Sequence, residues 1–340
     1  TTTATTARHG FGGDVVSALD THCPTTTVHF CCRAMSTTAD LTVVVPVSDT
    51  GDALLAWAVG RLEQLEQRWS RFRPESEISR LNSASGDALP VSLDTLLAVH
   101  TARAAWSHTE GRFDPTVHDA LLHLGYNRTI DELRTGIPAE RADELGAPLP
   151  APGCADIEID PYTSSVRLPS GTHIDLGGIG KGLAADLVAR GLIERGALGA
   201  LVNIGGDVRV TGTPPDGDAW HVDVLDPRTE QRFTSLDLRD GGVATSTTLR
   251  RHWRHGDHAH HHLVDPATGG STRSPVVGVT VVAGTAAWAD ALSKVPFVDP
   301  ACTLGFEPAA AFVLFADGSH RTVGPIDRFE RKGHDDAGGK

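Results

Sequence analysis

THIDLGGIGKGLAADLVARGL, residues 172–192, joins a short apolar segment to a glycine-rich turn and an amphipathic helical pattern. We predict a strand, a turn and then a helix over about residues 180–195. The free N–H groups and the positive end of such a helix would face one point, which suits a phosphate group. Two common phosphate-binding motifs are absent, because Lys181 is followed by glycine and Gly178, Gly180 and Gly182 are spaced G-x-G-x-G. A tight turn that needs glycine only for its backbone geometry is the alternative interpretation.

The segments around this stretch predict an α+β fold. Residues 41–47 (LTVVVPV) are a β-branched run typical of a buried strand, and amphipathic helices are predicted at residues 54–69 and at about 92–109. After residue 155 short strands dominate, one of them ending at Asp175, and a further helix starts near Thr285. Helices followed by a strand-rich body favour a mixed sheet with flanking helices over a doubly wound Rossmann sheet.

Composition limits the classes of partner and compartment. The chain has 340 residues, and its 43 acidic and 30 basic residues give a formal net charge of −13. We therefore expect no nucleic-acid partner, and the lack of an apolar run of about 18 residues predicts no transmembrane segment. Five cysteines without a C-x-x-C pair, and a start without a signal-peptide pattern, predict a cytoplasmic protein. The polar ends, residues 1–33 and 326–340, are predicted to be disordered tails.

Residues 250–270 contain six of the 17 histidines. Clustered imidazoles can bind divalent metals, but the spacing of a helical zinc motif with its carboxylate base is missing. His262 differs from the others because it directly precedes the apolar residues of LVDP, so we expect strand structure to hold it. A positioned histidine is the commonest general base at neutral pH, and His262 is the candidate.

Asp290 and Lys294 lie one helical turn apart in the segment WADALSK and therefore share a helix face. An Asp with a hydroxyl at that spacing would bind a hard cation through oxygen ligands. Because position 294 is lysine, an ion pair between the two side chains is the simplest interpretation.

A second glycine turn, in LVNIGGDVRVTG (201–212), joins two apolar segments. A hairpin explains its two adjacent glycines. Asn203 and Asp207 project near this turn, and we interpret both as ordinary turn formers.

The order of seven motifs along the chain resembles that of the ApbE family of FAD:protein FMN transferases. The motifs are RFRPESEISRLN (71–82), GRFDPTV (111–117), IDLGGIGKGLAAD (174–186), LVNIGGDVRVTG (201–212), VATS (243–246), HHLVDPATG (261–269) and WADAL (288–292). The resemblance implies a single domain with a T-fold-like core that binds FAD, here over residues 34–325. It also implies the reaction: a Ser or Thr hydroxyl of a target flavoprotein attacks the FMN phosphate of FAD, AMP leaves, and FMN stays attached through a phosphoester.

The resemblance assigns roles to individual residues. Met35 corresponds to the methionine that contacts the flavin, and Phe72 stands where the family usually has tyrosine, which keeps the ring but loses the hydroxyl. His262 resembles the histidine proposed to take the proton from the attacking hydroxyl. The other implied FAD-binding residues lie in the FDP segment, the glycine-rich turn and the ATS strand: Phe113, Asp114, Pro115, Asp175, Gly177, Gly178, Lys181 and Thr245.

The resemblance also implies a Mg²⁺ ion that bridges the pyrophosphate, held by an Asp, a Thr one turn later and a backbone carbonyl of the glycine-rich turn. Asp290 and Gly180 match the first and last of these ligands. Lys294 replaces the Thr, and Ser293 is the nearest hydroxyl. An ammonium group cannot ligate a cation and repels it. Either Lys294 turns away and Mg²⁺ binds with fewer protein ligands, or the ammonium takes the place of the metal.

Two other functions are consistent with the same residues. A hydrolase would split FAD into FMN and AMP with water in place of the protein hydroxyl. An FAD-binding protein without catalysis would hold the flavin and release no AMP, and Lys294 is the feature that favours it. Labelling of a target protein by flavin distinguishes transfer from both alternatives.

Overall fold

The computed structural model describes residues 24–133, 149–255, 258–304 and 309–331. Its centre is an eight-stranded sheet in the order β1-β2-β6-β7-β10-β13-β14-β15, in which every neighbouring pair is antiparallel. The strands are β1 (Thr25–Ala34), β2 (Thr37–Pro46), β6 (Gly199–Ile204), β7 (Asp207–Gly212), β10 (Gly241–Thr247), β13 (Val276–Ala283), β14 (Ala310–Phe315) and β15 (His320–Val323).

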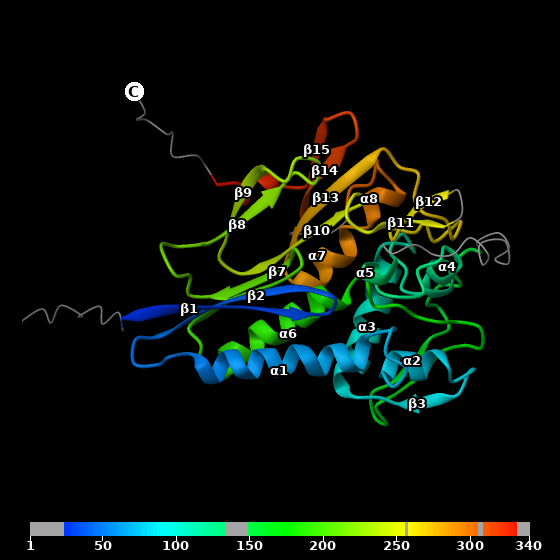
Figure 1. Cartoon of the computed structure of the whole chain (residues 1–340), viewed down its shortest axis with the longest axis horizontal. Coiled ribbons are helices and arrows are strands. Elements are labelled where there is room, and N and C mark those ends of the chain that lie inside the picture. Colours follow the sequence, from blue (N-terminus) through cyan, green and yellow to red (C-terminus); the bar gives the residue numbers. More distant parts are fainter. Residues whose placement is uncertain (1–23, 134–148, 256–257, 305–308, 332–340) are drawn as a thin grey trace, which may run out of the picture.

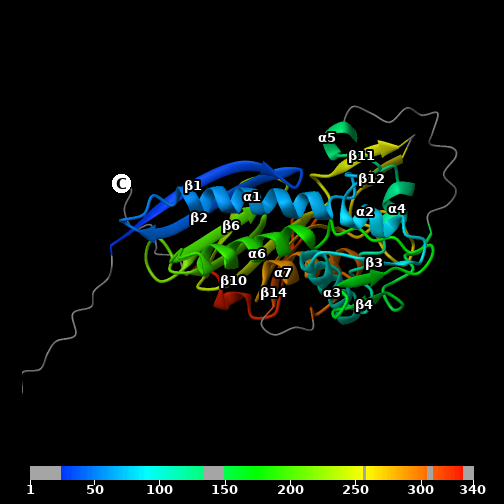
Figure 2. The ribbon, with the colours of Figure 1, turned by 90° about the horizontal axis from the view of Figure 1, so that it is seen from below.

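Helices pack against one face of this sheet (Figures 1 and 2). α1 (Asp52–Trp69) and α6 (Gly180–Glu194) lie along it, and α7 (Ala286–Leu292) contacts both α6 and β10. α3 (Leu93–His108) contacts α1 and α7. The side chains that α1 buries recur every three or four residues, as the amphipathic pattern predicts: Leu54, Ala58, Leu62, Leu65 and Trp69.

A hairpin of β8 (Trp220–Leu225) and β9 (Arg232–Leu238) contributes to a second core on the opposite face. The two cores divide the side chains of β2 between them. Val43 and Val45 belong to the helix-side core, whereas Val44 packs with the hairpin, because successive side chains of a strand point to opposite faces. The continuous apolar run in β2 is therefore explained by burial on both faces.

The remaining described elements are short. They are α2 (Glu77–Asn82), β3 (Ala88–Pro90), α4 (His118–His123), α5 (Ile130–Leu133), β4 (Glu158–Asp160), β5 (Ser165–Arg167), β11 (His252–His255), β12 (His258–His261), α8 (Val295–Val298) and the 3₁₀ helix η2 (Ile326–Arg328). Strands β3, β5 and β4 form a small sheet, and β11 pairs with β12. Within the described ranges, no helix combines the length and the apolar character that crossing a membrane requires.

The α+β class predicted from the sequence is confirmed. Two predicted tails differ from the structure, because residues 25–33 belong to β1 and residues 326–328 form η2. β1 pairs only with β2 and is largely exposed, so it carries Thr and His where a central strand would carry apolar residues. The other residues predicted as tails, 1–23 and 332–340, lie outside the described residues.

The segment before the glycine-rich turn is not a strand, contrary to the sequence prediction. Its backbone is held by other partners. The Asn82 side chain accepts from the N–H of Ile174 at 2.8 Å and donates to the Ile174 carbonyl at 2.9 Å. The N–H of Asp175 donates to the Pro115 carbonyl at 2.8 Å. These bonds satisfy an extended backbone without a neighbouring strand.

Gly182 allows α6 to approach α7 closely. A Cβ at this position would lie 2.3 Å from the Ala286 carbonyl oxygen, so Gly182→Ala is expected to lower the stability by about 1–3 kcal/mol. Gly60, in the interior of α1, is the matched control, since its Cβ would meet nothing within 4 Å. Gly60→Ala is expected to raise the stability by about 0.5–1 kcal/mol. Urea midpoints that shift equally in both variants would contradict this account of α6.

Candidate functional site

The glycine-rich turn ends where α6 begins, at Gly180. The side chain of its N-cap residue, Ile179, makes no capping hydrogen bond, whereas the Gly182 N–H in the first turn donates to Asp290 Oδ2. A Cβ on Gly178 would lie 3.0 Å from Phe113 Cε2 and 3.5 Å from Lys294 Cε, so glycine is required here by close packing. Gly177, Gly178 and Gly180 all line a cavity. The turn therefore presents backbone and a helix start to a space that can hold a ligand.

Two cavities meet at this turn. The first is mainly apolar and has a volume of about 170 Å³, and the second is more polar and has a volume of about 650 Å³. Both are lined by the same five residues, which we call the shared wall: Gly177, Lys181, Arg251, His262 and Lys294. A group bound at the shared wall can be reached from either side.

Aromatic rings form much of the first cavity. The rings of Phe72 and Tyr126 lie 5.9 Å apart, and the guanidinium of Arg71 lies over them at 4.3 and 4.5 Å from their centroids. Phe113 adds a buried ring, and Met35 lines the cavity from the turn between β1 and β2. Such surfaces suit a planar heteroaromatic ring, because stacking and cation–π contacts need flat apolar faces.

Three buried side-chain atoms in the described part of the chain have no hydrogen-bond partner, and all three belong to residues that line the first cavity. They are Arg71 Nη2, His262 Nδ1 and Thr272 Oγ1. Buried polar groups without partners are rare in proteins, because each costs free energy. Their three residues all line the first cavity, which favours a site for a polar ligand there.

Asp175 connects this cavity to the turn. Its Oδ2 pairs with Arg71 Nε at 2.9 Å, with both side chains at most 10% exposed, and its Oδ1 accepts the Gly177 N–H at 2.7 Å. The carboxylate therefore fixes the turn and the guanidinium together. Loss of either contact would release the wall of the cavity.

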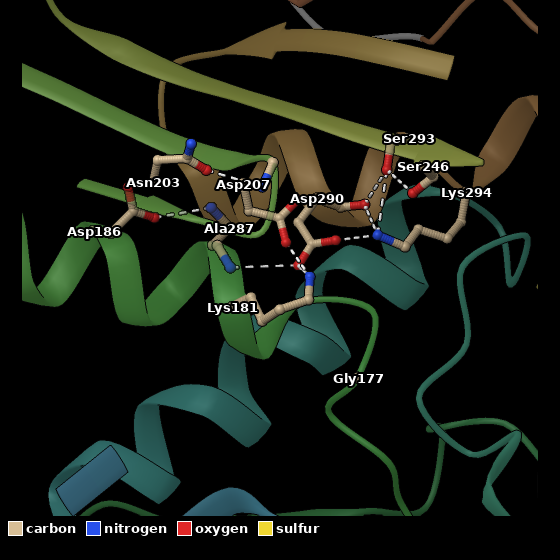
Figure 3. A network of polar contacts seen from close by, with 12 residues as sticks. Gly177, Lys181, Asp186, Asn203, Asp207, Ser246, Ala287, Asp290, Ser293 and Lys294 are labelled. Atoms are coloured by element: carbon tan, nitrogen blue, oxygen red, sulfur yellow. Dashed lines mark hydrogen bonds and ion pairs between the residues drawn. The ribbon is translucent and has the colours of Figure 1, made fainter. Parts of the chain in front are cut away.

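A cluster of two lysines and two aspartates lies beside the turn (Figure 3). We call Lys181, Asp207, Asp290 and Lys294 the lysine–aspartate cluster. Lys181 Nζ contacts Asp207 and lies 3.8 Å from Asp290 Oδ2, while Lys294 Nζ contacts Asp290 Oδ1. The side chain of Asp290 is fully buried, and that of Asp207 is 3% exposed.

Burial and charge act in opposite directions on this cluster. Burial raises the pKa of Asp290, but the two ammonium groups outweigh it and hold the pKa below its usual value. Burial lowers the pKa of Lys181, but the two carboxylates outweigh it and raise that pKa. Burial also keeps the pKa of Lys294 below its usual value. The burial of Asp207, together with the charge of Asp290, raises its pKa.

Asp186 of α6 orients the helix that carries Asp290. Its two carboxylate oxygens accept the N–H groups of Ala286 and Ala287, both at 2.9 Å, at the start of α7. Burial raises the pKa of Asp186 to about 6, against the lowering effect of these N–H groups and of Arg209. The contact locks α7 onto α6 and thereby fixes Asp290 against Lys181.

His262 follows β12 directly and lies on the shared wall. The backbone N–H of His262 donates to the Arg251 carbonyl at 3.2 Å, and this bond holds the backbone in place. Burial and the charges of Arg251 and Lys294 put the pKa of its imidazole well below the usual value. The ring is therefore neutral near pH 7 and able to accept a proton.

Residues 35–305 match the sequence profile of the ApbE family. This chain belongs to the ApbE family. A FAD:protein FMN transferase from Vibrio cholerae serotype O1 is 30% identical over 275 residues, which cover 79% of this chain and 80% of the relative. A FAD:protein FMN transferase from Treponema pallidum is 29% identical over 292 residues, which cover 78% of this chain and 78% of the relative.

Solved structures of ApbE proteins have the same fold. The ApbE protein of Thermotoga maritima superimposes with a TM-score of 0.76 and 26% identity over 90% of this chain and 100% of that chain. The flavinyl transferase ApbE of Pseudomonas stutzeri gives a TM-score of 0.74 at 22% identity, over 91% of this chain and 98% of its own. The ApbE-like fold predicted from the motifs is thereby confirmed.

The lysine–aspartate cluster does not fit the Mg²⁺ ion that membership of the ApbE family implies. Three oxygens that suit a hard cation, Asp290 Oδ1, the Asp290 carbonyl and Ser293 Oγ, surround one point, but Lys294 Nζ contacts all three. Two unit charges 4 Å apart interact by about 4 kcal/mol at an effective dielectric of 20, so a further cation is repelled. The Gly182 N–H donates to Asp290 Oδ2 at 3.4 Å. The role of the Gly180 carbonyl as a metal ligand stays a prediction from the resemblance.

Most of the sequence-predicted site residues come together around the first cavity. Pro115 does not line it, but its carbonyl holds Asp175. Asp114 does line it, yet its carboxylate is bound to the N–H and hydroxyl of Thr116 at 2.7 and 2.6 Å, and burial raises its pKa. Thr245 lines the second cavity instead, and its hydroxyl lies 2.9 Å from that of Thr280.

Several residues at the site were missed by sequence reasoning. Asp207 is the partner of Lys181, although a position after a glycine turn suggested a turn former. Asn203 is such a turn former, since its side chain accepts the Gly206 N–H at 2.9 Å. Ser246 lies 2.7 Å from Ser293, oxygen to oxygen, and Arg71 lies over the aromatic rings. Their motifs, VATS and RFRPESE, were the signals available.

Proposed function

We propose that this chain transfers FMN from FAD to a Ser or Thr hydroxyl of a target flavoprotein, with release of AMP. The observation that carries the proposal is that three residues with unpartnered buried polar atoms line one aromatic cavity, next to a glycine-rich helix start. The FAD:protein FMN transferases to which the chain is related support the same reaction.

In this proposal FAD lies with one aromatic part in the first cavity and its pyrophosphate at the shared wall. The tilted rings of Phe72 and Tyr126 would pack against the heteroaromatic ring. The Gly178 N–H of the turn and the Lys181 N–H at the start of α6 would donate to the phosphate oxygens. Lys181 and Lys294 would add positive charge near the phosphate that reacts.

The second cavity would admit the acceptor hydroxyl. Because His262 lines both cavities, a hydroxyl arriving there can lose its proton to the imidazole while its oxygen attacks the FMN phosphorus. The bond between this phosphorus and the bridging oxygen breaks, and that oxygen leaves with AMP. The new phosphoester joins FMN to the target, so phosphoryl transfer here depends on positioning and charge.

No step of this proposed reaction uses a bound metal. The cationic side chains of the shared wall are Lys181, Lys294 and Arg251, and they would neutralise the pyrophosphate. We also propose that the acceptor is a flavoprotein and that the chain is cytoplasmic, as the sequence predicts. Membership of the family does not name the acceptor.

Incubation with FAD and a candidate flavoprotein tests the function. We expect a covalently bound flavin that remains on the acceptor in a denaturing gel, together with release of one AMP for each flavin attached. AMP without a labelled acceptor would identify a hydrolase, and bound FAD without AMP would identify a binding protein. An acceptor whose Ser or Thr is replaced by alanine is the control and should stay unlabelled.

A further inference from the structure

We propose that the ammonium of Lys294 is a built-in cation that takes the place of a divalent metal at this site, so that the chain binds and processes FAD without one. The inference rests on the proposed function, because it concerns how the pyrophosphate of FAD is neutralised. It concerns position 294, where this chain has a lysine in place of the metal-binding Thr that the family resemblance implies.

The contacts of Lys294 Nζ show that the ammonium lies among oxygens that suit a cation. An ammonium has three N–H donors, and three oxygens surround this one: Asp290 Oδ1, the Asp290 carbonyl at 2.7 Å and Ser293 Oγ at 3.2 Å. Carboxylate, carbonyl and hydroxyl are the oxygen donors that hard cations take in proteins. The chain therefore keeps a cation-binding set of oxygens and supplies the cation itself (Figure 3).

The surroundings of Asp290 leave no place for a second cation. Its other carboxylate oxygen faces Lys181 Nζ at 3.8 Å and the Gly182 N–H at 3.4 Å. Ser293 Oγ is held in turn by Ser246 Oγ at 2.7 Å and donates to the Asp290 carbonyl at 2.7 Å. Each oxygen that a metal would need already has a partner.

The charges of the cluster balance without a metal. Two ammonium groups face two carboxylates, and the carboxylate side chains are almost completely buried. In the ligand-free protein, a divalent ion would add two uncompensated positive charges to this buried cluster. Removal of Lys294 would leave one positive and two negative charges, which is the condition that attracts a cation.

Lys294 lies where its charge would act on the pyrophosphate of bound FAD. Its Cε lies 3.5 Å from the point where a Gly178 Cβ would be, and the residue lines both cavities at the shared wall. The ammonium is thus a fixed positive charge behind the glycine-rich turn. Unlike a bound metal, it cannot be removed by a chelator.

Mn²⁺ binding, measured by the loss of its free electron paramagnetic resonance signal, tests the inference on the ligand-free protein. We expect no stoichiometric binding to the parent chain at about 10⁻⁴ M Mn²⁺, a concentration in the range of weak cation sites. Lys294→Thr restores an oxygen ligand one turn from Asp290 and is expected to bind one Mn²⁺ at least about tenfold more tightly than the parent. Lys294→Met, which removes the charge without adding an oxygen, should bind more weakly than Lys294→Thr.

One Mn²⁺ bound tightly to the parent chain would overturn the inference, and so would a folded Lys294→Thr variant that gains no affinity. Circular dichroism establishes that each variant is folded, and the parent measurement decides the question if a variant is not. Flavin transfer by the parent in EDTA separates the two proposals. Transfer that requires Mg²⁺ would overturn the inference alone, whereas absence of transfer with and without Mg²⁺ would contradict the proposed function.

Discussion

Replacement of His262 by alanine is expected to slow FMN transfer by about 10²–10⁴-fold, the usual contribution of a positioned general base. FAD binding should change little, because the aromatic cavity and the glycine-rich turn remain. The imidazole lines both cavities and has a buried Nδ1 without a partner, so in the proposed reaction it would contact the acceptor hydroxyl beside the FMN phosphate. The measurement is the single-turnover rate of acceptor labelling, with FAD affinity determined separately by calorimetry.

His258 is the matched control for this substitution. It lies in β12, is exposed and belongs to the same run of histidines. His258→Ala should therefore keep the transfer rate of the parent. Equal losses in the two variants would mean that the histidine run acts through folding or adventitious metal binding, and His262 would lose its assignment as the base.

The pH dependence of transfer follows from the low pKa of His262. Burial and the charges of Arg251, Lys294 and His261 disfavour the protonated ring. An ordinary histidine becomes half protonated near pH 6.5, but this ring stays neutral below that value. We therefore expect kcat/KM, which reports on the free enzyme, to stay level as the pH falls from 8 through 6.5. A fall with a midpoint near 6.5 would show an imidazole with an ordinary pKa.

The same low pKa affects stability with a definite sign. The unfolded chain binds a proton at this residue near pH 6.5, whereas the folded chain resists it. The contribution of His262 to stability is therefore complete above about pH 6.5 and is lost as the pH falls through the folded pKa. The anionic pyrophosphate of FAD acts in the other direction, because nearby negative charge favours the protonated ring.

The sequence predicted the parts of the site that lie in contiguous motifs. The helix start at Gly180, the helix that carries Asp290 and the pairing of Asp290 with Lys294 all depend on residues at most one turn apart. The order of the motifs also predicted the family. Local spacing is sufficient for such features, since helix and turn geometry fix the relation between near neighbours.

Features that depend on long-range packing could not be predicted in this way. Lys181 meets Asp207 because β7 packs against α6, a contact that neither motif contains. The extended segment before the turn was predicted as a strand, because its apolar pattern resembles one. Its partner is the Asn82 side chain, 92 residues away. A side-chain amide that replaces a strand leaves no periodic signal in the sequence.

Asp290→Ala is expected to lower the free energy of unfolding by about 3–5 kcal/mol, the usual loss when one partner of a buried ion pair is removed. The carboxylate is completely buried, contacts Lys294 and lies 3.8 Å from Lys181 Nζ. Its loss leaves two ammonium groups with only Asp207 between them. Urea denaturation monitored by circular dichroism measures the change.

A second substitution distinguishes charge from packing as the cause. In the double variant Asp290→Ala with Lys294→Met, the remaining charged pair is Lys181 with Asp207, so the cluster is neutral again. We expect the double variant to recover about half or more of the stability lost by Asp290→Ala, because an unpaired buried ammonium costs more than a lost pair. A double variant less stable than Asp290→Ala would show that the aspartate stabilises the site by filling space, and that its charge balance with the lysines contributes little.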